Sequence, residues 1–421
     1  MRNRDSEQIV ITGAGVSAAV GQGKAQFLAA LLEGRHRFDV MQRPGRQSPA
    51  VANTARERTT PASSFLGAEI AALSLPQFVP RDALRTASFS AQVALTTLAE
   101  AWDEARLDDV DPQRIGLVVG GSNFQQRELV RVHDTYRDRM HFLRPSYALS
   151  FMDSDVCGLC TELFGIRAFA YTLGGASASG QIAILQAIQA LLADEADVCI
   201  AMGALMDLSY WECQGLRSVG AMGSDRYAQE PARACRPFDK DRDGFIFGES
   251  CGAIVLERWD GASRSAVAPY ARVSGWAMGM DGNRKPNPSM EGEIQVIQRA
   301  LQRANLSARE IDYVNPHGTG SAIGDVTELG ALRHCKLDHA YLNATKSIIG
   351  HGLSAAGTVE TIAILLQMRA GQLHPTRNLD NPIEPSCNWV SAQAAAHSIQ
   401  NSLKLSMGFG GVNSALCLSK H

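Results

Sequence analysis

The sequence predicts an α/β protein, because short β-rich runs alternate with amphipathic helical stretches along the chain. The strand candidates of the first half are residues 8–16, 115–120, 167–173, 197–203 and 252–257. Those of the second half are residues 270–278, 311–315, 340–345, 403–407 and 414–419. A composition of 45% hydrophobic and 20% charged residues is that of a globular protein and argues against extensive disorder.

Helices are expected between these strands, at residues 24–33, 86–104, 181–194 and 290–304. In the third of them, one face carries apolar residues at helical spacing, namely Ile182, Leu185, Ile188 and Leu192. This stripe indicates core packing rather than ligand binding.

Cys157 and Cys160 form a CxxC within SDVCGLCTEL, which is also expected to be helical. No second ligand pair is spaced for zinc, so we interpret both thiols as packing residues, with metal or redox work as the alternative. The nine cysteines are scattered and odd in number, which suits a reducing compartment better than a disulfide framework.

Charge and hydropathy exclude several classes of function. The formal net charge of -3 offers no general attraction to nucleic acid or to an anionic membrane. No stretch approaches the roughly 20 apolar residues that span a bilayer. The N-terminus runs from a charged tail into a strand and lacks the apolar core of a secretory signal. We therefore expect a cytoplasmic protein.

Two irregular segments interrupt the pattern. Residues 35–60 are polar and are expected to form a long surface excursion. Residues 260–269 are interpreted as a hinge between an N-terminal half, 1–259, and a C-terminal half, 260–421. Each half opens with a strand, QIVITGAG in one and YARVSGWAMG in the other, although their similarity is too weak to prove a duplication.

Five separated segments together resemble the β-ketoacyl synthases of fatty-acid and polyketide assembly. They are QIVITGAGVSAAVGQGKAQFLAALLEG, ACRPFDKDRDGFIFGESCGAIVLE, NPHGTGSAIGDVTE, ATKSIIGHGLSAAG and MGFGGVNSAL, which follow one another in the family's order over nearly the whole chain. The resemblance implies a thiolase fold, with two similar halves of mixed sheet and helices in a five-layered α-β-α-β-α arrangement. It also implies a homodimer in which the strand at residues 167–173 pairs with its twin.

The chain departs from that family at the nucleophile. The family has a cysteine in a motif close to TACASG at the start of a buried helix, and the matching run here, GGASASG at 174–180, places Ser177 there. A helix N-terminus stabilises a thiolate by roughly 0.3–2 kcal/mol, a pKa shift of about one unit. An alcohol ionises several units higher, so Ser177 stays neutral unless a base adjoins it. Ser177 should therefore accept an acyl chain poorly. The alternative to a role in the site is that Ser177 only caps the helix.

The remaining family machinery is present. His317 and His351 match the two histidines that, in the family, bind the thioester carbonyl oxygen of a malonyl group and stabilise the enolate left by carbon dioxide. Lys346 matches the family lysine, and Asp325 and Glu328 match the acidic pair after the first histidine. We interpret Lys346 and Glu328 as a structural ion pair that supports the histidines, with proton transfer as the alternative.

The glycine-rich segment near the C-terminus supplies the expected pocket wall. Phe409 matches the family's gatekeeper aromatic beside the nucleophile, and Gly408, Gly410 and Gly411 permit close backbone approach. Met407 stands where the family more often has phenylalanine, which either alters the pocket or is a neutral core exchange.

The loss of acylation with retention of the decarboxylating groups predicts a malonyl-thioester decarboxylase. The pattern resembles the serine-containing ketosynthase homologues of polyketide β-branching cassettes, which convert malonyl-acyl carrier protein into the acetyl form for a hydroxymethylglutaryl-synthase-like partner. Ser177 would orient the thioester or be transiently acylated. The alternatives are a condensing or acyl-transfer enzyme with Ser177 as nucleophile, and a non-catalytic chain-length-factor-like partner.

An acyl carrier protein is the expected partner, and it would deliver the phosphopantetheine arm. No metal, nucleotide or flavin motif is present, since ITGAGV lacks the GxGxxG spacing. Because the carrier is expected to be acidic, a basic surface should receive it. Two arginine groups are candidates, or else merely solvated faces: Arg35, Arg37, Arg43, Arg46, Arg56 and Arg58, and Arg127, Arg131, Arg137 and Arg139.

Overall fold

Ten strands in two groups of five form the frame of the computed structural model, which describes residues 8–48, 64–259 and 264–421. The first group runs in the order β1-β9-β7-β5-β6 and the second in the order β10-β17-β16-β11-β12. In both groups the first two pairings are antiparallel and the last two are parallel. The two halves therefore share one topology.

All ten predicted strands are present; β5 has the predicted bounds, and the others differ at one or both ends. Those of the first group are β1 (Gln8–Ala18), β5 (Ile115–Gly120), β6 (Phe169–Leu173), β7 (Val198–Gly203) and β9 (Ser250–Trp259). Those of the second are β10 (Ala271–Met280), β11 (Tyr313–Asn315), β12 (Tyr341–Leu342), β16 (Asn401–Gly408) and β17 (Val412–Lys420). The short strands are β2 (Gly21–Gln22), β3 (Phe38–Val40), β4 (Leu66–Ala68), β8 (Phe247–Gly248), β13 (Gln372–Leu373), β14 (Asn388–Trp389) and β15 (Ala395–Ala396).

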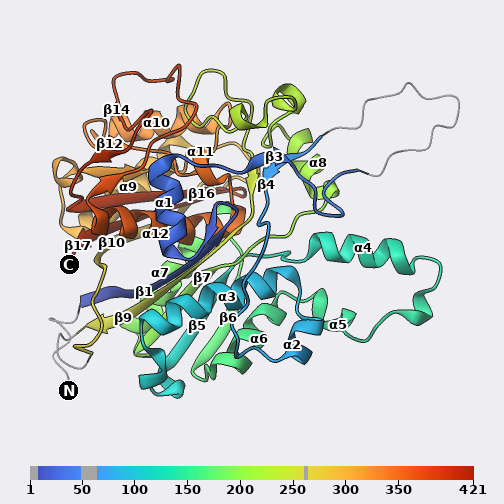
Figure 1. Ribbon diagram of the computed structural model, residues 1–421. Helices are drawn as coiled ribbons and strands as arrows, with labels where there is room; N and C mark the ends of the chain where they lie inside the picture. The colour runs from blue at the N-terminus through green and yellow to red at the C-terminus, as the bar shows by residue number, and fades with distance from the viewer. Residues whose placement is uncertain (1–7, 49–63, 260–263) are drawn as a thin grey trace, which may run out of the picture.

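The two groups meet where β1 pairs antiparallel with β10, with Val10 opposite Arg272 and Ile11 opposite Ala271. The opening strands of the two halves thus occupy equivalent places, and their pairing connects the two five-stranded groups, which are called the first and the second sheet below. Helices α7 (Ser179–Leu192) and α12 (Ala356–Ala370) lie between the sheets, because their apolar residues share one core with β1, β9, β10 and β17 (Figure 1). This buried layer is the middle of the fold.

Helices also cover the outer face of each sheet. On the first sheet, α3 (Phe89–Glu104) and α6 (Ser154–Phe164) pack over β5, β7 and β9. On the second, α9 (Met290–Ala304) and α10 (Gly324–His334) pack over β11, β16 and β17. The result is the expected α-β-α-β-α order of five layers. The remaining helices are α1 (Lys24–Glu33), α2 (Arg81–Thr86), α4 (Gln126–Tyr136), α5 (Tyr147–Ser150), α8 (Tyr210–Ser218) and α11 (Lys346–Ile349).

Several local predictions were wrong in detail. The helix expected at residues 86–104 begins only at Phe89, because the Ser88 side chain caps it by accepting the Ala91 N–H. In α7, Ile182, Leu185 and Ile188 are buried as predicted. Leu192, however, is 54% exposed, because it is the last residue of the helix, where α7 leaves the middle layer.

Cys157 and Cys160 lie in α6, as predicted, and both thiols are buried in the outer core of the first sheet. The Cys157 Sγ lies 3.2 Å from the Thr172 hydroxyl, and burial raises the pKa of both thiols. Across the described ranges no helix is long and apolar enough to cross a membrane.

Of the surface excursion expected at residues 35–60, residues 49–60 lie outside the described ranges, and the described part is not all exposed. Arg46 is fully buried, with its Nη2 at 2.6 Å from Glu249 Oε1 and 2.8 Å from Asp207 Oδ1. The Arg43 Nη2 lies 2.8 Å from Glu249 Oε2, and Arg127 of α4 also pairs with Asp207, at 2.9 Å. Arg43, Arg46 and Arg127 were therefore wrongly assigned to a carrier-docking surface: they neutralise carboxylates buried between elements.

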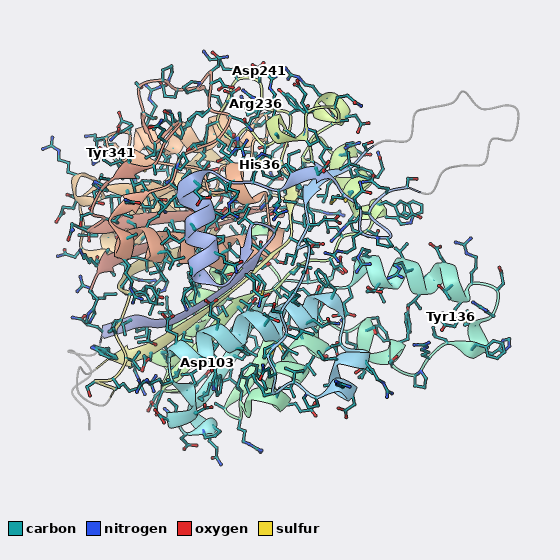
Figure 2. The ribbon with its side chains drawn as sticks, in the orientation of Figure 1. His36, Asp103, Tyr136, Arg236, Asp241 and Tyr341 are labelled. Atoms are coloured by element: carbon teal, nitrogen blue, oxygen red, sulfur yellow. The ribbon has the colours of Figure 1, made fainter. Side chains whose placement is uncertain are left out.

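The other candidate arginines are either exposed or outside the described ranges. Arg35, Arg37, Arg131, Arg137 and Arg139 are exposed, the last three on or beside the projecting α4 (Figure 1), whose last residue, Tyr136, is labelled in Figure 2. Arg56, Arg58 and part of the hinge, residues 260–263, lie outside the described ranges.

Substituting Glu249 by Gln is expected to lower the free energy of unfolding by about 3–5 kcal/mol, because buried Arg46 would lose a charge partner. Urea denaturation checks this. Glu33→Gln is the matched control, because it removes a pair with Arg35 whose side chains are 60% and 45% exposed and should change stability little. Equal effects of both substitutions would contradict the importance of this buried network.

Candidate functional site

One cavity of about 260 Å³ is lined by predicted site residues of both halves, all of them except Lys346 and Gly410. Ser177 enters it from the start of α7, His317 from the loop after β11 and His351 from the turn after α11. Phe409, in the turn between β16 and β17, lines the same cavity. Ser177 and His317 therefore line the same cavity, although they are 140 positions apart in the sequence.

Ser177 sits in a tight turn, residues Ala176–Ala178, directly before α7. Ala176 has a φ of 49°, in the left-handed region. The turn is closed by Ser179, whose hydroxyl accepts the Gly175 N–H at 2.8 Å and donates to the Ala176 carbonyl at 2.7 Å. Ser179 thus performs the backbone capping, and the Ser177 hydroxyl points to a different partner, His351.

The hydrogen bonds of His351 define which way its bond to Ser177 runs. The Nδ1 accepts the backbone N–H of Leu353 at 3.3 Å, so it carries no proton. In the neutral ring the proton is then on Nε2, which lies 3.0 Å from Ser177 Oγ. His351 therefore donates to the serine hydroxyl and does not act as its base.

His317 faces His351, with ring centroids 5.6 Å apart and the rings nearly perpendicular. Burial, the two lysines Lys346 and Lys404, and in the case of His317 also His351, lower the pKa of both imidazoles well below the ordinary value. Both rings are consequently neutral near pH 7. Two neutral N–H donors can hold an oxygen on which negative charge develops.

Lys346 does not pair with Glu328, so that prediction was wrong. Its Nζ lies 2.5 Å from Glu360 Oε1 and also donates to the carbonyl oxygen of His317. The other oxygen of Glu360 lies 2.7 Å from the Nζ of Lys404. All three side chains are buried, and together two ammonium groups and one carboxylate carry one net positive charge behind the histidines.

Glu360 and Lys404 were missed by the sequence analysis, although each leaves a signal. Glu360 is a lone acid in the apolar run AGTVETIAILL of α12, and Lys404 stands between two leucines of β16 and is the one charged residue of that strand. Buried charges of this kind are rare unless they are paired, which is the clue that a sequence offers.

Glu328 and Asp325 hold the backbone of the His317 loop instead. The Glu328 carboxylate accepts the N–H groups of His317 and Gly318 at 2.5 and 2.8 Å. Asp325 accepts that of Gly320 at 3.0 Å and that of Phe238 at 2.6 Å. Burial raises the pKa of Asp325 to about 6 and that of Glu328 to about 7. Both acids are positioning residues for His317.

The glycine-rich turn packs tightly against the Ser177 turn. A side chain at Gly408 would come within 2.3 Å of the Gly175 carbonyl oxygen, so only glycine fits there. Gly410 and Gly411 have φ angles of 90° and 81°. Phe409 is 42% exposed at the cavity, and Met407, although buried and packed into the core of the second half, lines the same cavity.

Comparisons with known proteins match this architecture. The family model "Beta-ketoacyl synthase, N-terminal domain" matches residues 6–262, and the corresponding C-terminal domain matches residues 270–380. The chain is 60% identical, over 98% of its length and 96% of the relative's, to the polyketide biosynthesis malonyl-ACP decarboxylase PksF of Bacillus subtilis. It is 29% identical to 3-oxoacyl-[acyl-carrier-protein] synthase 1 of Haemophilus influenzae, over 98% of both chains.

Solved structures of the same fold cover nearly the whole chain. A β-ketoacyl synthase from Burkholderia phymatum superposes with a TM-score of 0.85 at 24% identity, covering 99% of this chain and 100% of its own. A type II polyketide ketosynthase in complex with its acyl-carrier protein, AntDE:AntF, gives 0.83 at 23% identity, covering 99% of both chains. The thiolase-type fold predicted from the sequence is thereby confirmed.

Substituting Ser177 by Cys should create a thiol that reacts rapidly with iodoacetamide at about pH 6.5. The helix N-terminus and the His351 N–H both stabilise a thiolate at this position. Intact mass spectrometry would show one added group, while the nine natural cysteines are buried.

The matched control is Ser218→Cys, an exposed position at the C-terminal end of α8, where the helix dipole disfavours a thiolate. The thiol of the Ser177→Cys variant is expected to react at least about tenfold faster than that of the control, which corresponds to a pKa lower by about one unit. Equal rates would show that the site does not stabilise negative charge at residue 177.

Proposed function

The chain belongs to the β-ketoacyl synthase family, and we propose that it converts malonyl-S-acyl carrier protein into acetyl-S-acyl carrier protein in polyketide biosynthesis. The observation that carries this proposal is the direction of the bond between His351 and Ser177. It leaves an oxygen-binding pair of neutral histidines beside a serine that has no base. The high identity to PksF supports the same reaction.

His317 and His351 would bind the thioester carbonyl oxygen of the malonyl group. As the bond to the carboxylate breaks and carbon dioxide leaves, the electron pair moves into the enolate and charge grows on that oxygen. The His351 Nε2–H, which donates to Ser177 in the free enzyme, would turn to this oxygen, and His317 in the same cavity wall would supply the second N–H. The net positive charge of Lys346, Glu360 and Lys404 lies behind the rings and favours the same change.

Ser177 would orient the thioester rather than attack it. To act as a nucleophile its hydroxyl needs a base, and the neighbouring Nε2 already carries a proton. A condensing enzyme that uses Ser177 would require His351 to release the Leu353 N–H and exchange its tautomer. Retention of both histidines also disfavours a non-catalytic chain-length-factor-like role.

The partners follow from the same family. The phosphopantetheine arm would arrive with the carrier protein, and a hydroxymethylglutaryl-synthase-like enzyme would use the product. A homodimer would form through β6, which is the edge strand of the sheet. The segment after α4 exposes the large apolar side chains of Met140, Phe142 and Phe151, whose exposed fractions are 72%, 66% and 51%. A second subunit would cover them. Nine free cysteines suit the cytoplasm.

Incubation with malonyl-loaded carrier protein tests the reaction, with both proteins followed by intact mass spectrometry. Conversion of malonyl to acetyl carrier is expected. His317→Ala should slow it by about 10²-fold or more, because one oxyanion donor is lost. Ser177→Ala should stay within about tenfold of the unaltered enzyme, since orientation alone is lost.

An acyl group retained on the enzyme and absent from Ser177→Ala would favour the acyl-transfer alternative. Carrier protein that stays malonylated with the unaltered enzyme would refute the decarboxylase.

A further inference from the structure

Glu293 is a buried acid in the wall of the same cavity, and the sequence analysis did not identify it. It lies in the first turn of α9, in the C-terminal half, and its side chain is only 1% exposed. It lines the cavity together with Ser177, His317 and His351. Its Oε2 finds no hydrogen-bond partner among the described residues. A buried carboxyl oxygen without a donor is costly and calls for a reason.

The surroundings of Glu293 are acidic. Helix α9 packs on β10, β17 and α10, which bring Asp281, Asn413 and the pair Asp325 and Glu328 toward it. Asn413 donates to Asp281 at 2.6 Å, and the carboxylates of Asp325 and Glu328 accept backbone N–H groups.

Glu293 is thus the acid of this group that lacks a donor in the described part of the chain. Burial first, and then Glu328, Asp281 and Asp325, raise its pKa to about 9, so it keeps its proton near neutral pH. The other titratable groups on the cavity wall are the two neutral histidines and the exposed Lys285.

Decarboxylation without condensation needs a proton that condensation does not. When an enolate attacks an acyl group, its carbon forms a carbon–carbon bond. When no acyl group is held on residue 177, the enolate carbon must take a proton to become a methyl group. The histidines are occupied with the enolate oxygen, and the Ser177 hydroxyl would have to become an alkoxide.

We propose that Glu293 is the acid that protonates the enolate carbon. The inference rests on the proposed function and adds its second step. The carboxylic O–H bond breaks, its proton forms the new C–H bond, and the enolate electron pair returns to give the acetyl thioester and a Glu293 carboxylate. Water then reprotonates the carboxylate, so that one proton is consumed for each carbon dioxide released. A neutral acid also does not repel the incoming malonyl carboxylate.

The test compares single-turnover rates of acetyl-carrier formation in the unaltered enzyme and in Glu293→Gln, between about pH 7 and pH 10. Glutamine keeps the shape and neutrality of the protonated acid but has no proton of comparable acidity to give. The rate at pH 7 should fall by about 10²-fold or more. The unaltered enzyme should slow as pH rises through about 9, and Glu293→Gln should lose this dependence.

Glu291→Gln is the matched control, because Glu291 lies on the same helical turn but is exposed; it should retain the unaltered rate and pH dependence. Affinity for malonyl carrier, measured separately, should be equal in all three proteins. Glu293→Gln should fold at least as well, because ionising the buried acid at high pH opposes folding: its raised pKa makes the folded state lose stability as pH rises from about 4.5 to 9.

The unaltered enzyme tests the inference even without the variant, since a rate with no fall up to about pH 10 would overturn it. So would a Glu293→Gln enzyme with the original rate, or one that is slow yet keeps the fall centred near pH 9, because a group other than Glu293 would then be titrating. Lys404, whose pKa burial lowers to about 8, would give a fall about one pH unit lower. If the unaltered enzyme forms no acetyl carrier at all, the proposed function itself fails, which is a different result from an active enzyme that is indifferent to Glu293.

Discussion

The Glu360 carboxylate, buried between the ammonium groups of Lys346 and Lys404, is the interaction on which the site depends. Its removal would leave two buried charges without a partner, and a buried charge is tolerated only when it is paired. Lys346 in turn donates to the backbone of His317, so the ion pairs also position the loop that carries His317. Burial first, and then the ammonium groups of Lys346 and Lys404, lower the pKa of both histidines, and the net positive charge of the triad favours negative charge in the cavity.

Duplication of the topology explains how the site is assembled. The same strand order in both halves places α7 and α12 in one shared middle layer. The start of α7 then faces the loops of the second half, which carry His317 and His351. Close backbone approach completes the contact, since the Gly408 turn touches the Ser177 turn with no room for a side chain. Neither half alone contains a complete site.

The proposed decarboxylation differs from condensation in the fate of the enolate that forms when carbon dioxide leaves. A thiolate at residue 177 would be stabilised by the helix start and by His351, whereas a hydroxyl at that place only accepts a hydrogen bond. With a substrate bound, the His351 N–H would be donated to an enolate oxygen instead of to Ser177. A carbanion that meets no acyl group requires an acid, and a neutral Glu293 in the cavity wall satisfies that requirement without adding negative charge beside the malonyl group.

The sequence by itself determined the ten strands, the family, Ser177 and both histidines, because strand patterns are local and the motifs keep their order along the chain. It did not determine the partner of Lys346 or the burial of Arg43, Arg46 and Arg127, since ion pairs join residues far apart in the chain. The tautomer of His351 and the unpartnered Glu293 were likewise decided only by the tertiary structure. The direction of a hydrogen bond and the shifted pKa of a buried acid depend on neighbouring groups that only folding brings together.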